Sequence, residues 1–245
     1  MSNLILHCGA KKVTRAEVEA VPVPARTATW NPVPYADLID FMHEQADRRL
    51  GLPVVREQYG LNQDGNQLFA LLTLKTDRED NGLAIGMRQS YNKTLRAEAV
   101  AGSQVFVCDN LAFSGSALKV SRKNTLNVWR DFTAMMTGLV EESLGHYTKI
   151  NREFDRMKEI PVTERRGYAL LGVARGEGIL TAGQANIAFE DWETPRHEEF
   201  ADRNLWGLYN CFTEGLKKGT AGERIGRQVK AHDWFDQFLG AGELA

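Results

Sequence analysis

Three short apolar segments, separated by turn sequences that end in glycine, constrain the fold of this 245-residue chain more than any other feature. The segments are residues 54–61, 66–75 and 82–89, and the separators read NQDG and DREDNG. Asp or Asn before Gly suits the positive φ angles that hairpin loops need. The pattern predicts a three-stranded antiparallel meander, followed by a short strand at 104–108 and another from residue 117.

Helical periodicity is found on both sides of the predicted meander. Before it, Leu38, Ile39 and Met42 recur at helical spacing in a segment that starts at residue 35 and stops at Gly51. After it, apolar residues follow one helical face for about thirty residues, which predicts a long helix that breaks before Pro161. A helix of this length must lie across a sheet or pair with another helix.

We therefore expect an α+β fold, an antiparallel β-meander flanked by an N-terminal helix and a long helix and followed by a helical C-terminal region. Residues 1–34 are irregular apart from a capping box at Thr14 and Glu17, residues 35–160 form the α+β core, and residues 161–245 pack on it within one domain. In the last region we expect only helices, at 163–175, more loosely at 180–189, and at 204–218, with an exposed acidic loop at 190–202 between them.

Composition and charge exclude several classes of protein. A net charge of −2 provides no long-range field for polyanions, so a site for one must come from local clustering. The start of the chain lacks a secretory leader, and no apolar run approaches the roughly 18 residues that span a bilayer, so we expect a cytoplasmic protein with no membrane partner. Three widely spaced cysteines argue for reduced thiols rather than a disulfide framework.

Catalytic and cofactor motifs are weak. The five histidines are scattered without metal-ligand spacing, and the glycine-rich runs VARGEG and KGTAGERIG lack the Gly-Lys-Ser/Thr ending of a phosphate-binding loop. Cys108 follows an apolar strand and resembles a nucleophile at a strand end, but a half-buried cysteine that acts as a small hydrophobe is the commoner case. We predict no catalytic residue, no metal and no cofactor.

Residues 83–123 contain six basic side chains and only two acidic ones, Glu98 and Asp109. Near the basic groups stand Ser90 and Asn92, with Tyr91 and Phe113 as aromatic faces. Basic side chains that bind phosphates, combined with aromatic rings that stack on bases, are typical of proteins that bind single-stranded nucleic acid. An equally weighted alternative is a solvated sheet edge whose lysines prevent strand pairing. The basic residues are Arg88, Lys93, Arg96, Lys119, Arg122 and Lys123.

Two blocks of sequence resemble one family. QSYNKT leading into VFVCDNLAFSG resembles the serine-centred motif and Val-Cys-x-Asn signature of the phage, prophage and plasmid family called domain of unknown function 932, in which a His-Asp pair usually occupies the positions of Tyr91 and Asn92. NLWGLYNCFTEGLKKG is similar to a helix near the carboxyl end of that family. The resemblance implies a mobile element in a bacterial host cell, and it singles out Cys108, Asn110, Trp206, Asn210 and Glu214. A buried Asn210 or Glu214 needs a partner, and the loop at 108–110 is the hypothesis.

Two functional hypotheses from different classes follow. The first is a phage or mobile-element protein that binds nucleic acid, handling single strands in recombination or annealing, with a homo-oligomer suggested by fold-level analogy to annealing recombinases. The second is a protein-interaction factor that inhibits a host defence enzyme through the acidic loop at 190–202. A third, an enzyme centred on Cys108, His146 or Glu214, has no support from residue spacing.

Overall fold

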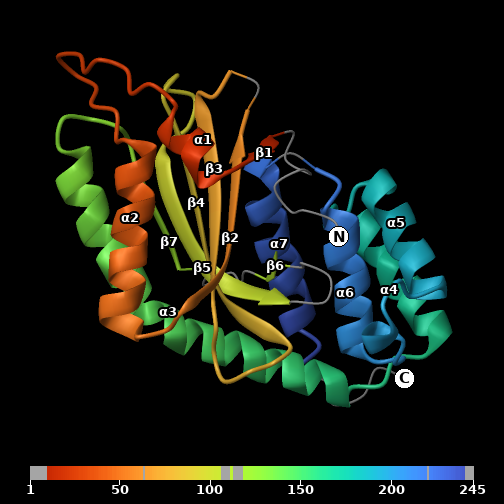
Figure 1. Ribbon diagram of the computed structural model, residues 1–245. Helices are drawn as coiled ribbons and strands as arrows, with labels where there is room; N and C mark the ends of the chain where they lie inside the picture. The colour runs from red at the N-terminus through yellow and green to blue at the C-terminus, as the bar shows by residue number, and fades with distance from the viewer. Residues whose placement is uncertain (1–9, 63, 106–110, 113–117, 220, 241–245) are drawn as a thin grey trace. The chain divides into compact units, whose positions relative to one another are not determined.

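The computed structural model describes residues 10–62, 64–105, 111–112, 118–219 and 221–240 (Figure 1). The chain divides into two compact units, and the division falls within the long helix, between Tyr147 and Thr148. We call Gly9–Gln104 with Ala117–Tyr147 the sheet unit, and Thr148–Ala245 with Met1–Cys8 and Val105–Ser116 the helical unit. The expectation that the helical C-terminal region packs on the core within one domain stays a prediction.

The sheet unit contains the predicted antiparallel meander, and the α+β class is confirmed. Its strands run in the order β1-β2-β3-β4-β5, and β7 pairs with β5. Leu68 lies opposite Leu61 on one side and Gln89 on the other, so the central strand continues both hairpins in register. The strand bounds are β1 Lys11–Val13, β2 Val54–Leu61, β3 Gln67–Leu74, β4 Asn81–Ser90, β5 Ala97–Val105 and β7 Lys119–Arg122.

Strand β5 differs from the sequence expectation, which started a strand at residue 104. It begins seven residues earlier, and its inward residues Ala97, Ala99 and Ala101 are at most 2% exposed. Alanines alternate with Glu98 and Val100 there, and alanine is depleted in strands, so the period-2 signal is weak. Residues 106–108 of the expected strand lie outside the described residues.

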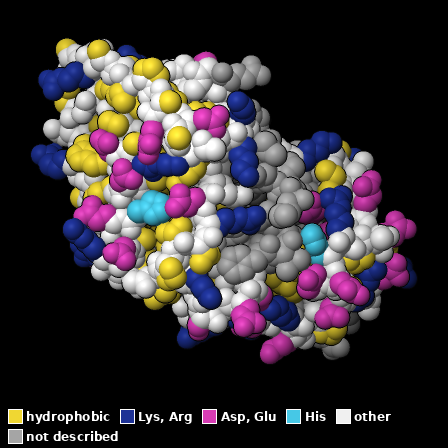
Figure 2. All heavy atoms as spheres, in the orientation of Figure 1, with side chains coloured by type: hydrophobic (Ala, Val, Ile, Leu, Met, Phe, Trp, Pro, Cys, Tyr) yellow, Lys and Arg dark blue, Asp and Glu magenta, His cyan; other side chains and the backbone are white. Residues whose placement is uncertain are grey.

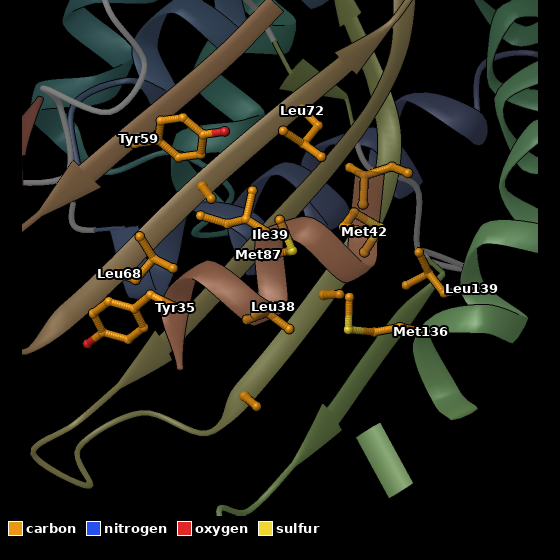
Figure 3. Close-up of a cluster of buried hydrophobic side chains, with 14 of the residues drawn as sticks. Tyr35, Leu38, Ile39, Met42, Tyr59, Leu68, Leu72, Met87, Met136 and Leu139 are labelled. Carbon is orange, nitrogen blue, oxygen red and sulfur yellow. The ribbon is translucent and has the colours of Figure 1, made fainter. Parts of the chain in front are cut away.

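Helices cover one face of the sheet and supply its core. The capping box at Thr14 is present at the start of α1 (Arg15–Glu19). Helix α2 (Tyr35–Gln45) continues as the π-helix η2 (Ala46–Leu50) and ends at Gly51, whose φ is +60°. Figure 3 shows side chains of α2, the strands and α3 (Val128–Glu159) pointing toward one another, among them Leu38, Ile39, Met42, Leu68, Leu72, Met87, Met136 and Leu139.

The helical unit is built around one buried helix. In α6 (Leu205–Leu216) every residue except Glu214 is buried, as expected for a helix enclosed on all sides. Aromatic side chains fill the surrounding core, including Phe154, Trp192, Tyr209, Phe212 and Phe235. The other elements are β6 (Leu111–Ala112), α4 (Glu164–Gly176), α5 (Ala182–Glu193), the 3-10 helix η3 (Glu198–Phe200) and α7 (Ala221–Asp236).

One local expectation for this unit is confirmed and another was wrong. The looser helix expected at 180–189 is α5, which begins at Ala182 after a capping box of Thr181 and Gln184 and extends to Glu193. The acidic segment at 190–202 is only partly exposed, because Asp191, Trp192 and Phe200 are buried. The segment was expected to be exposed because runs of charged residues usually indicate a solvated face. The buried apolar residues between the carboxylates anchor it instead.

Candidate nucleic-acid interface

Three of the six predicted basic residues converge on one groove of the sheet unit. Lys93 and Arg96 belong to the connection between β4 and β5, and Lys123 follows β7 directly. These three side chains are exposed, and within the described part of the chain no carboxylate pairs with them or lines the groove. The groove, here called the basic groove, has a volume of about 410 Å³, and its other lining residues are Thr29, Trp30, Thr94, Leu95, Asn124 and Thr125.

Strand pairing and one serine explain this convergence. Ala97 of β5 lies opposite Arg122 of β7, so the antiparallel register brings Arg96 and Lys123 to the same end of the strand pair. The hydroxyl of Ser90 accepts a hydrogen bond from the Leu95 amide at 2.8 Å and donates one to the Leu95 carbonyl at 3.1 Å. Ser90 is fully buried, so its role is to close the loop that carries Lys93 and Arg96.

Asn92 and Lys93 shape the tip of that loop. The Asn92 side-chain oxygen accepts hydrogen bonds from the amide and hydroxyl of Thr94, an Asx-type turn. Lys93 has a φ of +65°, in the left-handed region that non-glycine residues visit rarely. Asn92 therefore acts on the loop conformation, and Lys93 is held in a strained backbone geometry at the groove.

Trp30 lines the groove, although no sequence pattern singles it out. Its indole is 9% exposed, and the Lys93 ammonium lies 5.0 Å from the centre of its ring. The Asn31 amide donates to the Asn124 carbonyl at 3.0 Å, which holds the Trp30 segment against the residues that follow β7. The indole Nε1 and the Asn124 Oδ1 are buried and have no hydrogen-bond partner among the described residues.

The remaining predicted cations are paired with carboxylates. The Arg88 Nε lies 2.6 Å from Glu98 Oε2, and the Lys119 Nζ lies 3.5 Å from the same oxygen. Burial would raise the pKa of Glu98, but the hydrogen bond and charge of Arg88 outweigh it, so the pKa of Glu98 lies below its usual value. Arg122 pairs with Asp131 at 2.6 Å. These three cations do not line the basic groove.

Tyr91, selected as a ring for base stacking, is a core residue instead. It is 5% exposed, and its ring is stacked on Tyr35 with centres 3.8 Å apart and planes within 3°. Its hydroxyl accepts a hydrogen bond from the Tyr35 amide at 3.0 Å. One face of the ring and its hydroxyl are thus engaged within the fold, and the rest of the residue is buried, so Tyr91 offers no surface to a base. Phe113, the other selected ring, lies outside the described residues.

The family-signature residues that can be placed are structural. Trp206 and Asn210 are buried in α6, and the Asn210 side chain donates to the Trp206 carbonyl at 2.9 Å. Glu214 pairs with Arg196 at 2.8 Å and with Lys217. Cys108 and Asn110 lie outside the described residues, so the hypothesis that Asn210 or Glu214 contacts that loop stays a prediction.

The described residues hold no arrangement typical of a metal site. No group of three or more His, Cys, Asp or Glu side chains in this part of the chain could hold a metal ion. His146 is 8% exposed, and Glu214 is ion-paired as above. Among the helices that the structure describes, none is both long and apolar enough to span a membrane.

Basic and acidic side chains are mixed on one face of the molecule. On the face seen in Figure 2, basic and acidic side chains alternate rather than forming a field of one sign. This agrees with the net charge of −2. The basic groove, with three cations and no carboxylate among its described lining residues, differs from this mixed face.

Comparison with known proteins returned no family model, no curated protein and no solved structure that matches this chain. The resemblance to domain of unknown function 932 stays a prediction. Function must therefore be argued from the chemistry of the basic groove itself.

Proposed function

We propose that the basic groove binds the phosphates of single-stranded nucleic acid. The observation that carries this proposal is the convergence of Lys93, Arg96 and Lys123 on one groove with no carboxylate among its described lining residues. Unpaired cations repel one another, and that cost is tolerated where an anionic ligand neutralises them. A phosphate backbone is such a ligand, and its binding releases counterions.

The size of the groove favours a single strand over a duplex. Its volume of about 410 Å³ lies near the lower end of the range for pockets that hold drug-sized molecules, which is room for roughly one nucleotide. A duplex would contact only the rim of such a groove. Trp30 in the groove wall adds an aromatic ring, and cationic grooves with aromatic rings are the usual way to hold unpaired strands.

The wider biological role is proposed on the family resemblance. A phage or other mobile element that carries out recombination or strand annealing needs proteins that hold single strands. One groove accommodates about one nucleotide, so tight binding of a longer strand requires several copies side by side, which fits a homo-oligomer. We include oligomer formation on the strand as part of the proposed function.

Fluorescence anisotropy with labelled single- and double-stranded oligonucleotides across a salt series tests the proposal. Three phosphate contacts predict a slope of about −2 for the logarithm of affinity against that of salt, or about 20-fold weaker binding at 200 mM than at 50 mM salt. The variant Lys93→Gln/Arg96→Gln/Lys123→Gln should lose most of the affinity and the slope. Failure of the wild type to bind at low salt, or equal binding by the variant, would refute the proposal.

A matched control removes the same charge from other places. Lys12, Lys75 and Arg165 are exposed and do not line the basic groove. The variant Lys12→Gln/Lys75→Gln/Arg165→Gln changes net charge by the same amount as the groove variant. It should retain wild-type affinity and slope, because only a general charge effect would weaken it equally.

A second candidate function is inhibition of a host defence enzyme through protein contact. It is favoured by a run of exposed carboxylates on the acidic segment, namely Glu190, Glu193, Glu198, Glu199 and Asp202. Such a run suits a partner with a basic surface, as nucleic-acid-cleaving enzymes have. Expression of the chain in a restricting bacterial host should then raise the plating efficiency of an unmodified phage, and the five-fold Glu/Asp→Gln/Asn variant should not. An unchanged efficiency would contradict this candidate.

A further inference from the structure

We infer that Trp30 is a stacking surface for one base of the bound strand and that Lys93 covers this surface until the base arrives. The inference rests on the proposed function, because it requires a strand in the basic groove. It adds a second ligand group, the base, to the phosphates that the cations hold. The observation behind it is the position of the Lys93 ammonium, 5.0 Å from the centre of the Trp30 ring.

The covered face of Trp30 is the one next to the groove. Trp30 and Lys93 both line the groove, and the ammonium stands over the ring within the distance of a cation–π contact. The rest of the indole is packed into the protein, since the residue is 9% exposed. A base that enters the groove and meets this ring would take the place that the ammonium now occupies.

Exchange of the ammonium for a base is favourable. A cation–π contact at an exposed site contributes about 0.5–1 kcal/mol, whereas a base stacked on an aromatic side chain contributes about 1–3 kcal/mol. The displaced ammonium also gains a phosphate, and it has no carboxylate partner among the described residues to leave behind. Lys93 thus moves from the ring to the backbone of the strand as the base is bound.

Two residues that line the groove also carry buried polar atoms. Trp30 Nε1 is a donor and Asn124 Oδ1 an acceptor, on residues 9% and 7% exposed, and neither has a hydrogen-bond partner among the described residues. Leaving such an atom unpaired costs about 1–3 kcal/mol. Both atoms are closed off from solvent, so the base is held by stacking on the ring and not by these two atoms.

Base recognition of this kind separates unpaired from paired strands. A base in a duplex is stacked between its neighbours and cannot reach Trp30, whereas an unpaired base can leave its stack at low cost. Preference among the four bases should be small, because every base has a face that stacks. The site therefore selects single strands without selecting a sequence.

An abasic strand separates this inference from the proposed function. Affinities are measured by anisotropy for a labelled oligo-dT and for an abasic oligonucleotide of equal length, which keeps the phosphates and lacks the bases. The wild type should bind oligo-dT about 5- to 150-fold more tightly, as expected for one stacked base. Equal affinity for the two strands would overturn the inference and leave the proposed function intact. Absence of binding to both would overturn both.

Substitution of the ring locates the effect. Trp30→Leu should bind the two strands equally, while Trp30→Phe, which keeps an aromatic face, should retain part of the preference for oligo-dT. The matched control is Trp129→Leu, because Trp129 is a 38% exposed tryptophan that does not line the groove. A folded Trp30→Leu variant, with the wild-type circular dichroism spectrum, that still prefers oligo-dT to the same extent would overturn the inference.

Discussion

Replacement of Gly167 by alanine is expected to destabilise the helical unit, although alanine is the better helix former. Gly167 lies in α4, with the indole of the buried Trp192 directly against it. A Cβ at this position would lie 2.2 Å from Cε2, 2.3 Å from Nε1 and 2.5 Å from Cζ2 of that indole. Carbon atoms in contact stay about 3.5–4.0 Å apart, so the indole must move.

The change in the free energy of unfolding is the sum of two destabilising contributions and one stabilising contribution. Overpacking of a filled core costs about 1–3 kcal/mol. Movement of the indole also breaks the hydrogen bond that Trp192 Nε1 donates to the Glu164 carbonyl at 3.2 Å, at a further cost of about 1 kcal/mol. Alanine in place of glycine stabilises the helix by about 1 kcal/mol, because alanine has the higher helix propensity. The net loss in free energy of unfolding is therefore about 1–3 kcal/mol.

Thermal unfolding followed by circular dichroism measures this loss. In a chain of this length each kcal/mol lowers Tm by about 2–4 °C, so Gly167→Ala should lower it by several degrees. Gly172→Ala is the matched control, because Gly172 lies in the same helix and a Cβ there would meet no described atom within 4 Å beyond its own turns of the helix. That variant should raise Tm by about 2–4 °C. A Tm for Gly167→Ala at or above the wild-type value would refute the close contact with Trp192.

The remaining predictions concern three ionisable groups, those of Glu98, Asp191 and Cys211. Glu98→Gln should leave strand affinity and its salt slope unchanged in the anisotropy assay, because Glu98, Arg88 and Lys119 do not line the basic groove. The pKa of Glu98 is lowered in the folded protein, so the ionised carboxylate stabilises the fold. This stabilisation is complete above the ordinary carboxyl pKa and is lost as the pH falls through the lowered pKa. Acid should therefore reduce the Tm of the wild type more than the Tm of Glu98→Gln. Burial raises the pKa of Asp191, so ionisation destabilises the fold as pH rises past the ordinary value, and Asp191→Asn should raise Tm at neutral pH but not in acid. Burial also raises the pKa of the Cys211 thiol, so iodoacetamide at pH 8 should modify Cys211 only after denaturation. Mass spectrometry measures the modification, and rapid labelling of Cys211 in the native protein would contradict this prediction.

The local elements of the sheet unit could be predicted because their signals are local. Gly65 has a φ of +72° in the expected turn, and Gly51 ends the π-helix η2 in the left-handed conformation. Both positions require a conformation that glycine adopts without cost, and the sequence shows glycine there. The apolar spacing of Leu38, Ile39 and Met42 likewise reflects the face that α2 turns toward the sheet.

The aromatic residue of the groove could not be chosen from sequence. Tyr91 stands within the basic stretch, yet it is buried against Tyr35, a residue 56 positions earlier whose amide bonds to its hydroxyl. Trp30 stands far from the stretch, in a segment that pattern analysis describes only as irregular, and the bond between Asn31 and Asn124 brings it there. Proximity along the chain selected the wrong ring because contacts of this kind are long-range.

The number of cations available to a ligand could not be predicted from the sequence either, because it depends on long-range pairing with carboxylates. The six basic residues were expected to act together, but partners fixed by strand register divide them into two sets. In β5, Glu98 lies opposite Ser121, whose hydroxyl donates to it at 3.1 Å, and that placement lets one carboxylate hold both Arg88 and Lys119. The loop after β4 and the residue after β7 have no such carboxylate within the described lining of the groove. Three cations therefore stabilise the sheet and three remain for a ligand, so the slope of affinity against salt should correspond to about three phosphates rather than six.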